Sequence, residues 1–355
     1  MPTLCDVQRV LFVSAAITLA CLPSPLEAQR VDLRLGTPGS RLAGSPVDKG
    51  AFGLIQAAAF VPSVGFVAVD VSRPRLHLIG LNGRLLATTG RGGSGPGEMR
   101  EPASVALLGR DTVVVLDRAL QRLSFVRVAT RSLTHVRSVG LKYDLFDICS
   151  LDRRFVALGY TARTGRPLHF LSGAGDRGDG WGDPFFEEKD KRAEALVNEV
   201  ATIGRLACAA DAGFVIVAPK LRGIVQLYDR TGALRWQTDL VDYVPTNVRM
   251  VSGGGVLFGR QPGQSITDNT VGLVLLSNEL VLVQTAGVSK QHPGGGFDYA
   301  HVVSRLLRVS DGKEIGRSKD LPIILAAGEG RVLTAGSDGL DLWIEVRPFT
   351  VVKSD

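Results

Sequence analysis

Two short stretches, FVAVD at 66–70 and VVVLD at 113–117, share one pattern of apolar residues that ends in an aspartate. Each aspartate is followed five residues later by an Arg-Leu pair, at 75–76 and at 122–123. Similar apolar starts recur along the chain at 155–158, 214–217, 256–258 and 331–333. Short runs of β-branched and aromatic residues between glycine-rich turns are typical of strands. The recurrence therefore predicts a repeat of strand-rich units.

Each unit is expected to contain four strands in two hairpins. An apolar residue, suited to a buried strand before a short turn, stands six positions before every start: Phe60, Leu107, Cys149, Cys208, Met250 and Leu325. Pairs such as Asn82-Gly83 and Asp311-Gly312 suit two-residue turns, because both central residues readily take positive φ. The first five starts lie 42 to 59 residues apart, which with four strands per unit is typical of a propeller blade. One such sheet cannot bury both faces alone, so the blades must stack and the ring must close.

The later part of the chain departs from this period. The last two starts are 75 residues apart and an additional strand pair occupies 271–285, so the alternatives are an enlarged fifth blade or a seventh blade. The segment 185–201 predicts a short inserted helix, and its charged run 187–192 should be solvated. The strand-like segment 30–35 is expected to join the final blade. We predict an all-β, six-bladed β-propeller with four-stranded antiparallel blades, and seven blades as the alternative.

The first residues have the composition of a targeting signal. Arg9 precedes an apolar run at 10–22, and a small-residue cleavage signal ends before Gln29. The run is too short for a membrane span, which needs about 20 residues. We predict a signal peptide at 1–28, a single propeller domain at 29–355, and a periplasmic or secreted protein. No other segment is apolar enough to span a membrane.

The cysteines bear on the same compartment. Cys149 and Cys208 remain after the predicted cleavage and hold equivalent places in consecutive units. They should lie on adjacent inner strands, buried as small hydrophobic residues. A disulfide between them, which an oxidising compartment would permit, is the alternative. Cys21 is an alternative site for a lipid anchor, although Thr18-Leu19-Ala20 before it is a poor lipidation signal.

The run TGRGGSGPGEMREP at 89–102 holds a Gly-Pro-Gly-Glu element between a hairpin strand and the next unit. Together with Asp70, Asp117 and their Arg-Leu pairs, it resembles bacterial six-bladed propellers of the NHL-repeat and TolB-like kind. As a repeat the resemblance covers nearly the whole chain, but only the first two units match the motif closely. It implies the fold and often export. It implies no single activity, because function resides in sites carried on a shared fold.

Several motifs have a structural interpretation beside a functional one. Asp70 and Asp117 could line a ligand site, but an aspartate at a strand end is expected to accept hydrogen bonds from turn amides, with the nearby arginine as a pairing partner. The run 92–98 could cradle a phosphate, but it leads into a strand, so we expect a connection between blades. The carboxylates of 175–183 could bind calcium, but they lack the EF-hand spacing, so we expect a flexible surface turn.

No residues form a catalytic or metal-binding motif. The histidines are scattered, and we expect structural or surface roles for all five: His77, His135, His169, His292 and His301. The chain has no Gly-x-Ser-x-Gly elbow and no Cys/His arrangement for nucleophilic catalysis. We therefore predict no catalytic residues, no metal site and no cofactor.

One face of the predicted propeller collects positive charge. In this fold the loops between second and third strands and the loops between blades lie on one face. Those loops hold our candidate binding residues: Arg73, Arg75, Arg91, Arg100, Arg118, Arg122, Arg163, Arg166, Lys220 and Arg222. Such a face could hold an anionic glycan, a lipid head group or an acidic protein; the alternative is that these residues only solvate the loops. Nucleic acid is not expected, because aromatic residues do not alternate with the basic ones.

A well-formed repeat without catalytic residues predicts an exported, non-catalytic binding or scaffold module that is expected to be a monomer. Its ligand or protein partner is unknown, and the basic loops favour an anionic one. The alternative is a metal-dependent hydrolase or lyase with its site in the central channel, as in some six-bladed propellers. That site needs Glu, Asp, Asn or His from the inner strands of several blades. The inner positions assigned above are apolar, so an enzymatic activity is the weaker hypothesis.

Overall fold

The computed structural model describes residues 30–44, 51–161, 163–251, 254–291, 297–338 and 341–353. The predicted signal peptide, with Cys21, and His292 lie outside these residues. Within them, no helix has both the length and the apolar character of a membrane span.

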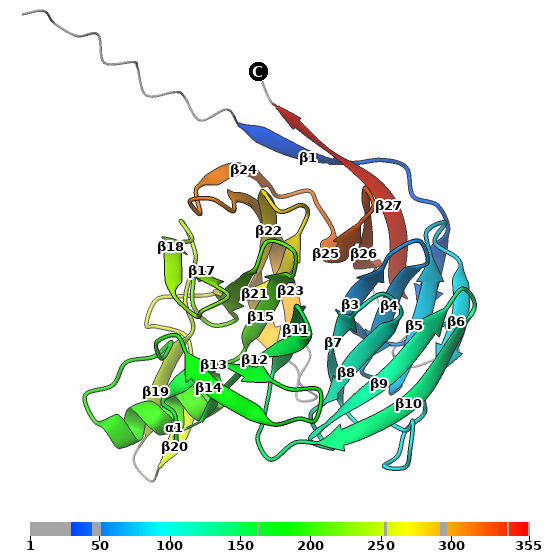
Figure 1. Cartoon of the computed structure of the whole chain (residues 1–355). Helices are drawn as coiled ribbons and strands as arrows, with labels where there is room; N and C mark the ends of the chain where they lie inside the picture. Colours follow the sequence, from blue (N-terminus) through cyan, green and yellow to red (C-terminus); the bar gives the residue numbers. More distant parts are fainter. Residues whose placement is uncertain are drawn as a thin grey trace, which may run out of the picture.

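The strands form six antiparallel blades around a common axis (Figure 1). Blade 1 contains β3 (Ile55–Val61), β4 (Gly65–Asp70), β5 (Arg75–Gly80) and β6 (Leu85–Thr89), and blade 2 contains β7 (Pro102–Leu108), β8 (Thr112–Asp117), β9 (Arg122–Ala129) and β10 (Ser132–Gly140). Blade 3 contains β11 (Asp147–Leu151), β12 (Arg154–Thr161), β13 (Arg166–Leu171) and β14 (Arg177–Trp181), and blade 4 contains β15 (Gly204–Ala209), β16 (Phe214–Pro219), β17 (Ile224–Asp229) and β18 (Leu234–Asp239). Blade 5 contains β21 (Thr267–Leu275), β22 (Leu280–Gln291), β23 (Phe297–Arg308) and β24 (Glu314–Ser318), and blade 6 is built on β25 (Ile323–Gly328), β26 (Arg331–Asp338) and β27 (Asp341–Lys353). The predicted six-bladed propeller is confirmed.

The hydrophobic core lies between the blades, in one layer for each pair of neighbours. Between blades 3 and 4, for example, Val156 and Leu158 pack in one cluster with Val215 and Val217. The second strands of the first four blades, β4, β8, β12 and β16, are buried on both faces over most of their length, which explains why their sequences are continuous apolar runs. This stacking leaves a narrow central channel, lined by the first strand of every blade.

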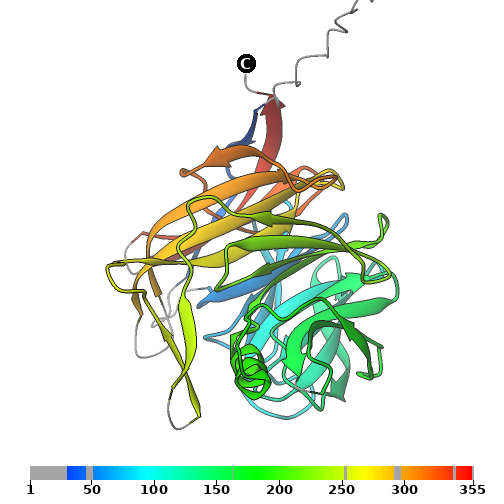
Figure 2. The ribbon, with the colours of Figure 1, turned by 90° about the vertical axis from the view of Figure 1, so that its left-hand side faces the viewer.

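The N-terminal residues close the ring, as predicted. Both β1 (Val31–Leu35) and β2 (Arg41–Gly44) pair antiparallel with β27, so together they supply the outer strand of blade 6. Figures 1 and 2 show β1 and the end of β27 extending side by side from the body of the propeller. Leu33 of β1 is buried in the layer between blades 5 and 6.

The predicted fifth blade was placed wrongly. The strands β19 (Asn247–Val251) and β20 (Gly255–Gly259) form a separate two-stranded hairpin, which projects from the body in Figure 2. The pair at 271–285, taken as an addition, belongs to the two inner strands of blade 5. The hairpin resembles a blade in sequence because Met250 and Val256 are apolar for another reason: they pack against the core cluster that includes the helix.

The inserted helix is confirmed as α1 (Lys191–Ala201), which begins after Asp190, whose carboxylate accepts a 3.0 Å hydrogen bond from the Arg192 amide. Val197 and Ala201 bury one side of α1 against blades 3 and 4. The segment 175–183, expected to be a flexible turn, instead contains β14, the outer strand of blade 3. Pairing with β13 overrides its high glycine content.

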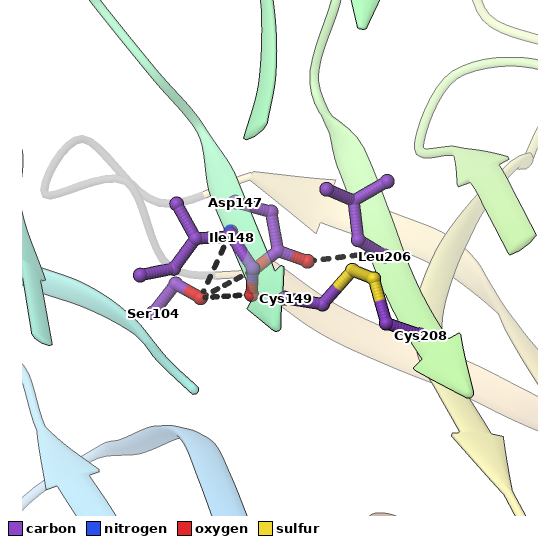
Figure 3. Close-up of a disulfide and its surroundings, with 6 residues drawn as sticks. All are labelled: Ser104, Asp147, Ile148, Cys149, Leu206 and Cys208. Carbon is purple, nitrogen blue, oxygen red and sulfur yellow. Dashed lines mark hydrogen bonds between the residues drawn. A yellow bond between two sulfur atoms is a disulfide. The ribbon is translucent and has the colours of Figure 1, made fainter. Parts of the chain in front are cut away.

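Cys149 and Cys208 lie on the adjacent inner strands β11 and β15, as predicted, and they are joined by a disulfide (Figure 3). The sequence favoured two buried cysteines without a bond between them, and that prediction is therefore wrong. The bond crosses from blade 3 to blade 4 and closes a segment with a sequence separation of 59.

Candidate functional site

The inner strands all run in the same direction, so their first residues gather at one end of the channel. This end is surrounded by the loops between second and third strands and by the loops between blades. We call this end of the propeller the loop face. Here the channel narrows to a cavity of about 80 Å³ whose lining includes Gln56, Ser104, Asp147 and Arg205. The inner-strand positions assigned from the sequence are apolar, and the polar residues at this end occupy other positions of the same strands.

Arg205 spans the channel at the loop face. Its guanidinium Nη2 donates a 3.1 Å hydrogen bond to the carbonyl oxygen of Gln56. Arg205 belongs to blade 4 and Gln56 to blade 1, three blades away around the ring. A charged side chain therefore occupies the centre of the channel mouth.

Asp147 connects three neighbouring inner strands (Figure 3). Its Oδ1 accepts hydrogen bonds from the Ser104 hydroxyl of blade 2 and from the Ile148 amide, and its Oδ2 accepts a 2.7 Å bond from the Leu206 amide of blade 4. Burial raises the pKa of Asp147, while Arg205 and the three donors oppose that rise. Each carboxylate oxygen already has a partner, so this group acts as a structural connection between blades.

A larger pocket, which we call the mouth pocket, lies between blades 4 and 5 and the β19–β20 hairpin. Its volume is about 530 Å³, and it is lined by Ile203, Lys220, Leu221, Thr246, Val256, Leu257, Phe258, Gly259, Arg260, Thr267, Asn269 and Val288. Two cations, Lys220 and Arg260, thus face an apolar wall that includes Leu257 and Phe258, which are 45% and 43% exposed. None of these lining residues carries a carboxylate.

The charge of Lys220 is held in an unfavourable environment. Burial, and then the neighbouring charge of Arg205, lower the pKa of Lys220 to about 8. Lys220 and Arg205 therefore both place positive charge near the channel mouth.

The predicted binding residues lie in loop-face segments, but five of them hold loops in place. Arg91 pairs with Glu98 and Arg118 with Glu101. Arg122 donates to the carbonyl oxygens of Ser94, Gly95 and Glu98; Arg166 donates to the Asp183 carboxylate; and Arg222 donates to the carbonyl oxygen of Phe185. These contacts fix loop geometry at the positions where the sequence suggested ligand contacts.

Of the other five predicted residues, four are exposed or half-buried and one lines the mouth pocket. Arg75, Arg100 and Arg163 are exposed, and Arg73 is half-buried. Lys220 alone lines the mouth pocket. Sequence analysis missed Arg205 and Arg260, because neither lies in a loop of the matched repeat. Asp147 and Arg205 stand two and three residues before the paired cysteines, at the starts of inner strands. This spacing is the sequence signal that could have placed both charged residues at the channel.

Asp70 and Asp117 have the structural role that the sequence favoured. Asp70 accepts a 2.6 Å hydrogen bond from the Gly53 amide, and Asp117 accepts a 2.8 Å bond from the Arg100 amide. In both blades the amide lies 17 residues before the aspartate, so the motif locks the start of the inner strand to the end of the second strand. The arginine of the motif does not pair with its aspartate in blade 2, where Arg122 binds the Gly-Pro-Gly-Glu loop instead.

The described histidines have structural or surface positions. His77 is buried next to Asp70, with 3.4 Å between Nε2 and Oδ2, and His169 is buried with Nε2 3.0 Å from the Arg166 carbonyl oxygen. His135 contacts Ser138, and the exposed His301 lies 3.7 Å from Asp268. Among the described residues no three His, Cys, Asp or Glu side chains are grouped to hold a metal ion.

Six blades closed by N-terminal strands make this protein a six-bladed β-propeller, with a polar channel mouth on its loop face. No family model matches the sequence, and no curated protein matches it. The similarity to solved structures extends over nearly the whole chain. A DUF4221 family member from Bacteroides vulgatus is 10% identical with a TM-score of 0.61, covering 92% of this chain and 100% of that one. A Bacteroides fragilis protein, named as a candidate exported protein, is 10% identical with a TM-score of 0.52, covering 91% and 96%. The fold of the predicted resemblance is confirmed, while its NHL-repeat and TolB-like label is approximate.

Proposed function

We propose that the protein is an exported, non-catalytic binding propeller whose mouth pocket holds an organic anion with an apolar body. The observation that carries this proposal is the pairing of Lys220 and Arg260 with the apolar wall formed by residues such as Leu257 and Phe258. Ligand pockets of about 300–1,000 Å³ with mostly apolar linings and few polar groups are typical of small-molecule sites. The mouth pocket has this size and composition.

The ligand class follows from the lining. An apolar wall favours a hydrocarbon or aromatic body, because burying that body removes apolar surface from water. The two cations favour a carboxylate or a similar anion, and Thr246, Thr267 and Asn269 add hydrogen-bonding groups. The exposed arginines of the loop face then act at longer range, by raising the local concentration of anions rather than by touching them.

Export is supported by two independent observations. A disulfide joins Cys149 and Cys208, and disulfides persist in oxidising compartments such as the periplasm or the extracellular space. The Bacteroides fragilis relative in structure is also named as a candidate exported protein. Localisation can be measured by fractionating cells that express the full chain and by determining the N-terminus of the product by mass spectrometry. A mature chain that begins near Gln29 is expected; an uncleaved cytoplasmic chain would contradict export.

Isothermal titration calorimetry with octanoate, acetate and octyl glucoside tests the mouth pocket on the chain from Gln29 onward. Octanoate should bind more tightly than acetate, which lacks the apolar body, and more tightly than octyl glucoside, which lacks the charge. Lys220→Gln should raise the octanoate Kd at least tenfold, equivalent to about 1.4 kcal/mol. Arg131→Gln, at an exposed residue outside the pocket, is the matched control. Equal octanoate affinity in both variants, or no octanoate binding, would overturn the proposal.

A further inference from the structure

A second basic cavity lies between blades 2 and 3, and we call it the side groove. Its volume is about 590 Å³, and its lining comes from the segment before β11, the β12–β13 loop and the β13–β14 turn. It is lined by Gly140, Lys142, Tyr143, Thr161, Arg163, Ala174, Gly175, Asp176 and Arg177. Three cations therefore face this cavity together with one carboxylate, and it shares no residue with the mouth pocket.

Arg177 is held in a fixed position in this groove. Its Nη1 donates a 3.1 Å hydrogen bond to the Thr161 hydroxyl, and its guanidinium carbon lies 4.7 Å from the centroid of the Tyr143 ring. Tyr143 is itself anchored, because its hydroxyl donates a 2.6 Å bond to the carbonyl oxygen of Gly175. A guanidinium with two such supports is already ordered, so binding would cost little side-chain entropy.

The cations of the groove repel one another. Burial, and then the charge of Arg163, lower the pKa of Arg177. Burial lowers the pKa of His169 to about 4, and the positive charges of Arg177 and Arg163 contribute to this lowering. Within the described part of the chain, no carboxylate lies at ion-pair distance from Arg163 or Arg177. Two neighbouring guanidiniums without an acidic partner are the arrangement that an anion stabilises.

We propose that the side groove binds a tetrahedral oxyanion, carried on a sulfate ester or a phosphate monoester, between Arg163 and Arg177. Arginine suits this group because its planar fork donates two parallel hydrogen bonds to oxyanion oxygens. Lys142 adds a third positive charge at the rim. The site goes beyond the mouth pocket in both location and ligand chemistry, since its lining contains no aliphatic side chain larger than that of Ala174.

Titrations with glucose 6-sulfate and glucose 6-phosphate, in buffer free of both inorganic ions, test this proposal on the mature chain. At least one ester should bind, and the tighter one identifies the source of the oxyanion; equal affinities indicate that the shared oxyanion is recognised. Arg163→Gln should raise the Kd at least tenfold. Arg163 is exposed, and its side chain makes no hydrogen bond or ion pair with the described part of the chain, so the variant should fold normally. Arg131→Gln and Lys220→Gln should bind as the unchanged protein does, which separates this site from the mouth pocket.

A crystal soaked in selenate gives a direct readout of position. An anomalous peak between Arg163 and Arg177 that is missing in crystals of Arg163→Gln would support the site. A groove without selenate density, failure of both esters to bind, or an unchanged affinity in Arg163→Gln would overturn it.

Discussion

His169 shows how single buried residues set the response of this protein to pH. Its side chain on β13 is fully buried, and Nε2 lies 3.0 Å from the carbonyl oxygen of Arg166 while Nδ1 has no partner. Burial first, then the positive charges of Arg177 and Arg163, lower the pKa from 6.5 to about 4. The folded state therefore holds the ring neutral. The stabilisation linked to this shift is complete above pH 6.5 and is lost as the pH falls toward 4.

We expect the free energy of unfolding to fall by about 2–3 kcal/mol more in the unchanged protein than in His169→Gln between pH 7 and pH 4, because one pKa unit corresponds to about 1.4 kcal/mol. Urea denaturation of both proteins at the two pH values measures this difference. Carboxylates titrate equally in both, so they cancel in the comparison. An identical pH dependence in the two proteins would show that His169 is not held neutral.

At the scale of elements, the inner strands β11 and β15 are joined at two levels. The Asp147 carboxylate accepts from the Leu206 amide, and the disulfide joins Cys149 to Cys208 two residues further on (Figure 3). A cross-link over a separation of 59 residues restricts the unfolded chain, and disulfides of this kind contribute about 2–4 kcal/mol. The double variant Cys149→Ser, Cys208→Ser should lose that amount in urea denaturation.

Reduction provides the control for this prediction. Dithiothreitol should lower the urea midpoint of the unchanged protein and leave the midpoint of the double variant where it was. If the unchanged protein shows no response to a reductant that fully converts it to free thiols, the bond does not stabilise the fold.

The same elements show what sequence can and cannot supply. Apolar spacing placed Cys149 and Cys208 on adjacent inner strands, because strand periodicity is local. It did not decide between burial and a bond, which depends on how two blades are set against each other. It also assigned 256–258 to a blade, because an apolar hairpin that covers a helix has the same local pattern. Arg205 and Arg260 were missed, since neither lies in a loop of the matched repeat, and only the packing of the β19–β20 hairpin on blades 4 and 5 brings Arg260 to the mouth pocket.

At the scale of the whole molecule, the ring closes within blade 6, where the first described strand, β1, pairs with the last, β27. The last residues of β27, from Phe349 to Lys353, pair only with β1 among the described strands. Leu33 of β1 is buried against Leu282 and Leu306 of blade 5. The N-terminal strand therefore joins neighbouring blades as well as completing its own.

We expect Leu33→Ala to lower the free energy of unfolding by roughly 2–4 kcal/mol, since it removes a buried leucine from a packed layer. A chain that begins at Gly36 should lose more, because the end of β27 would also lose its partner. The strand edge freed in that way presents unpaired backbone groups, so the truncated chain should self-associate in size-exclusion chromatography. Leu85→Ala on the outer strand of blade 1, which is 38% exposed, should cost much less. A truncated chain that remains monomeric with an unchanged denaturation midpoint would mean that the ring closes without β1, through β2 alone.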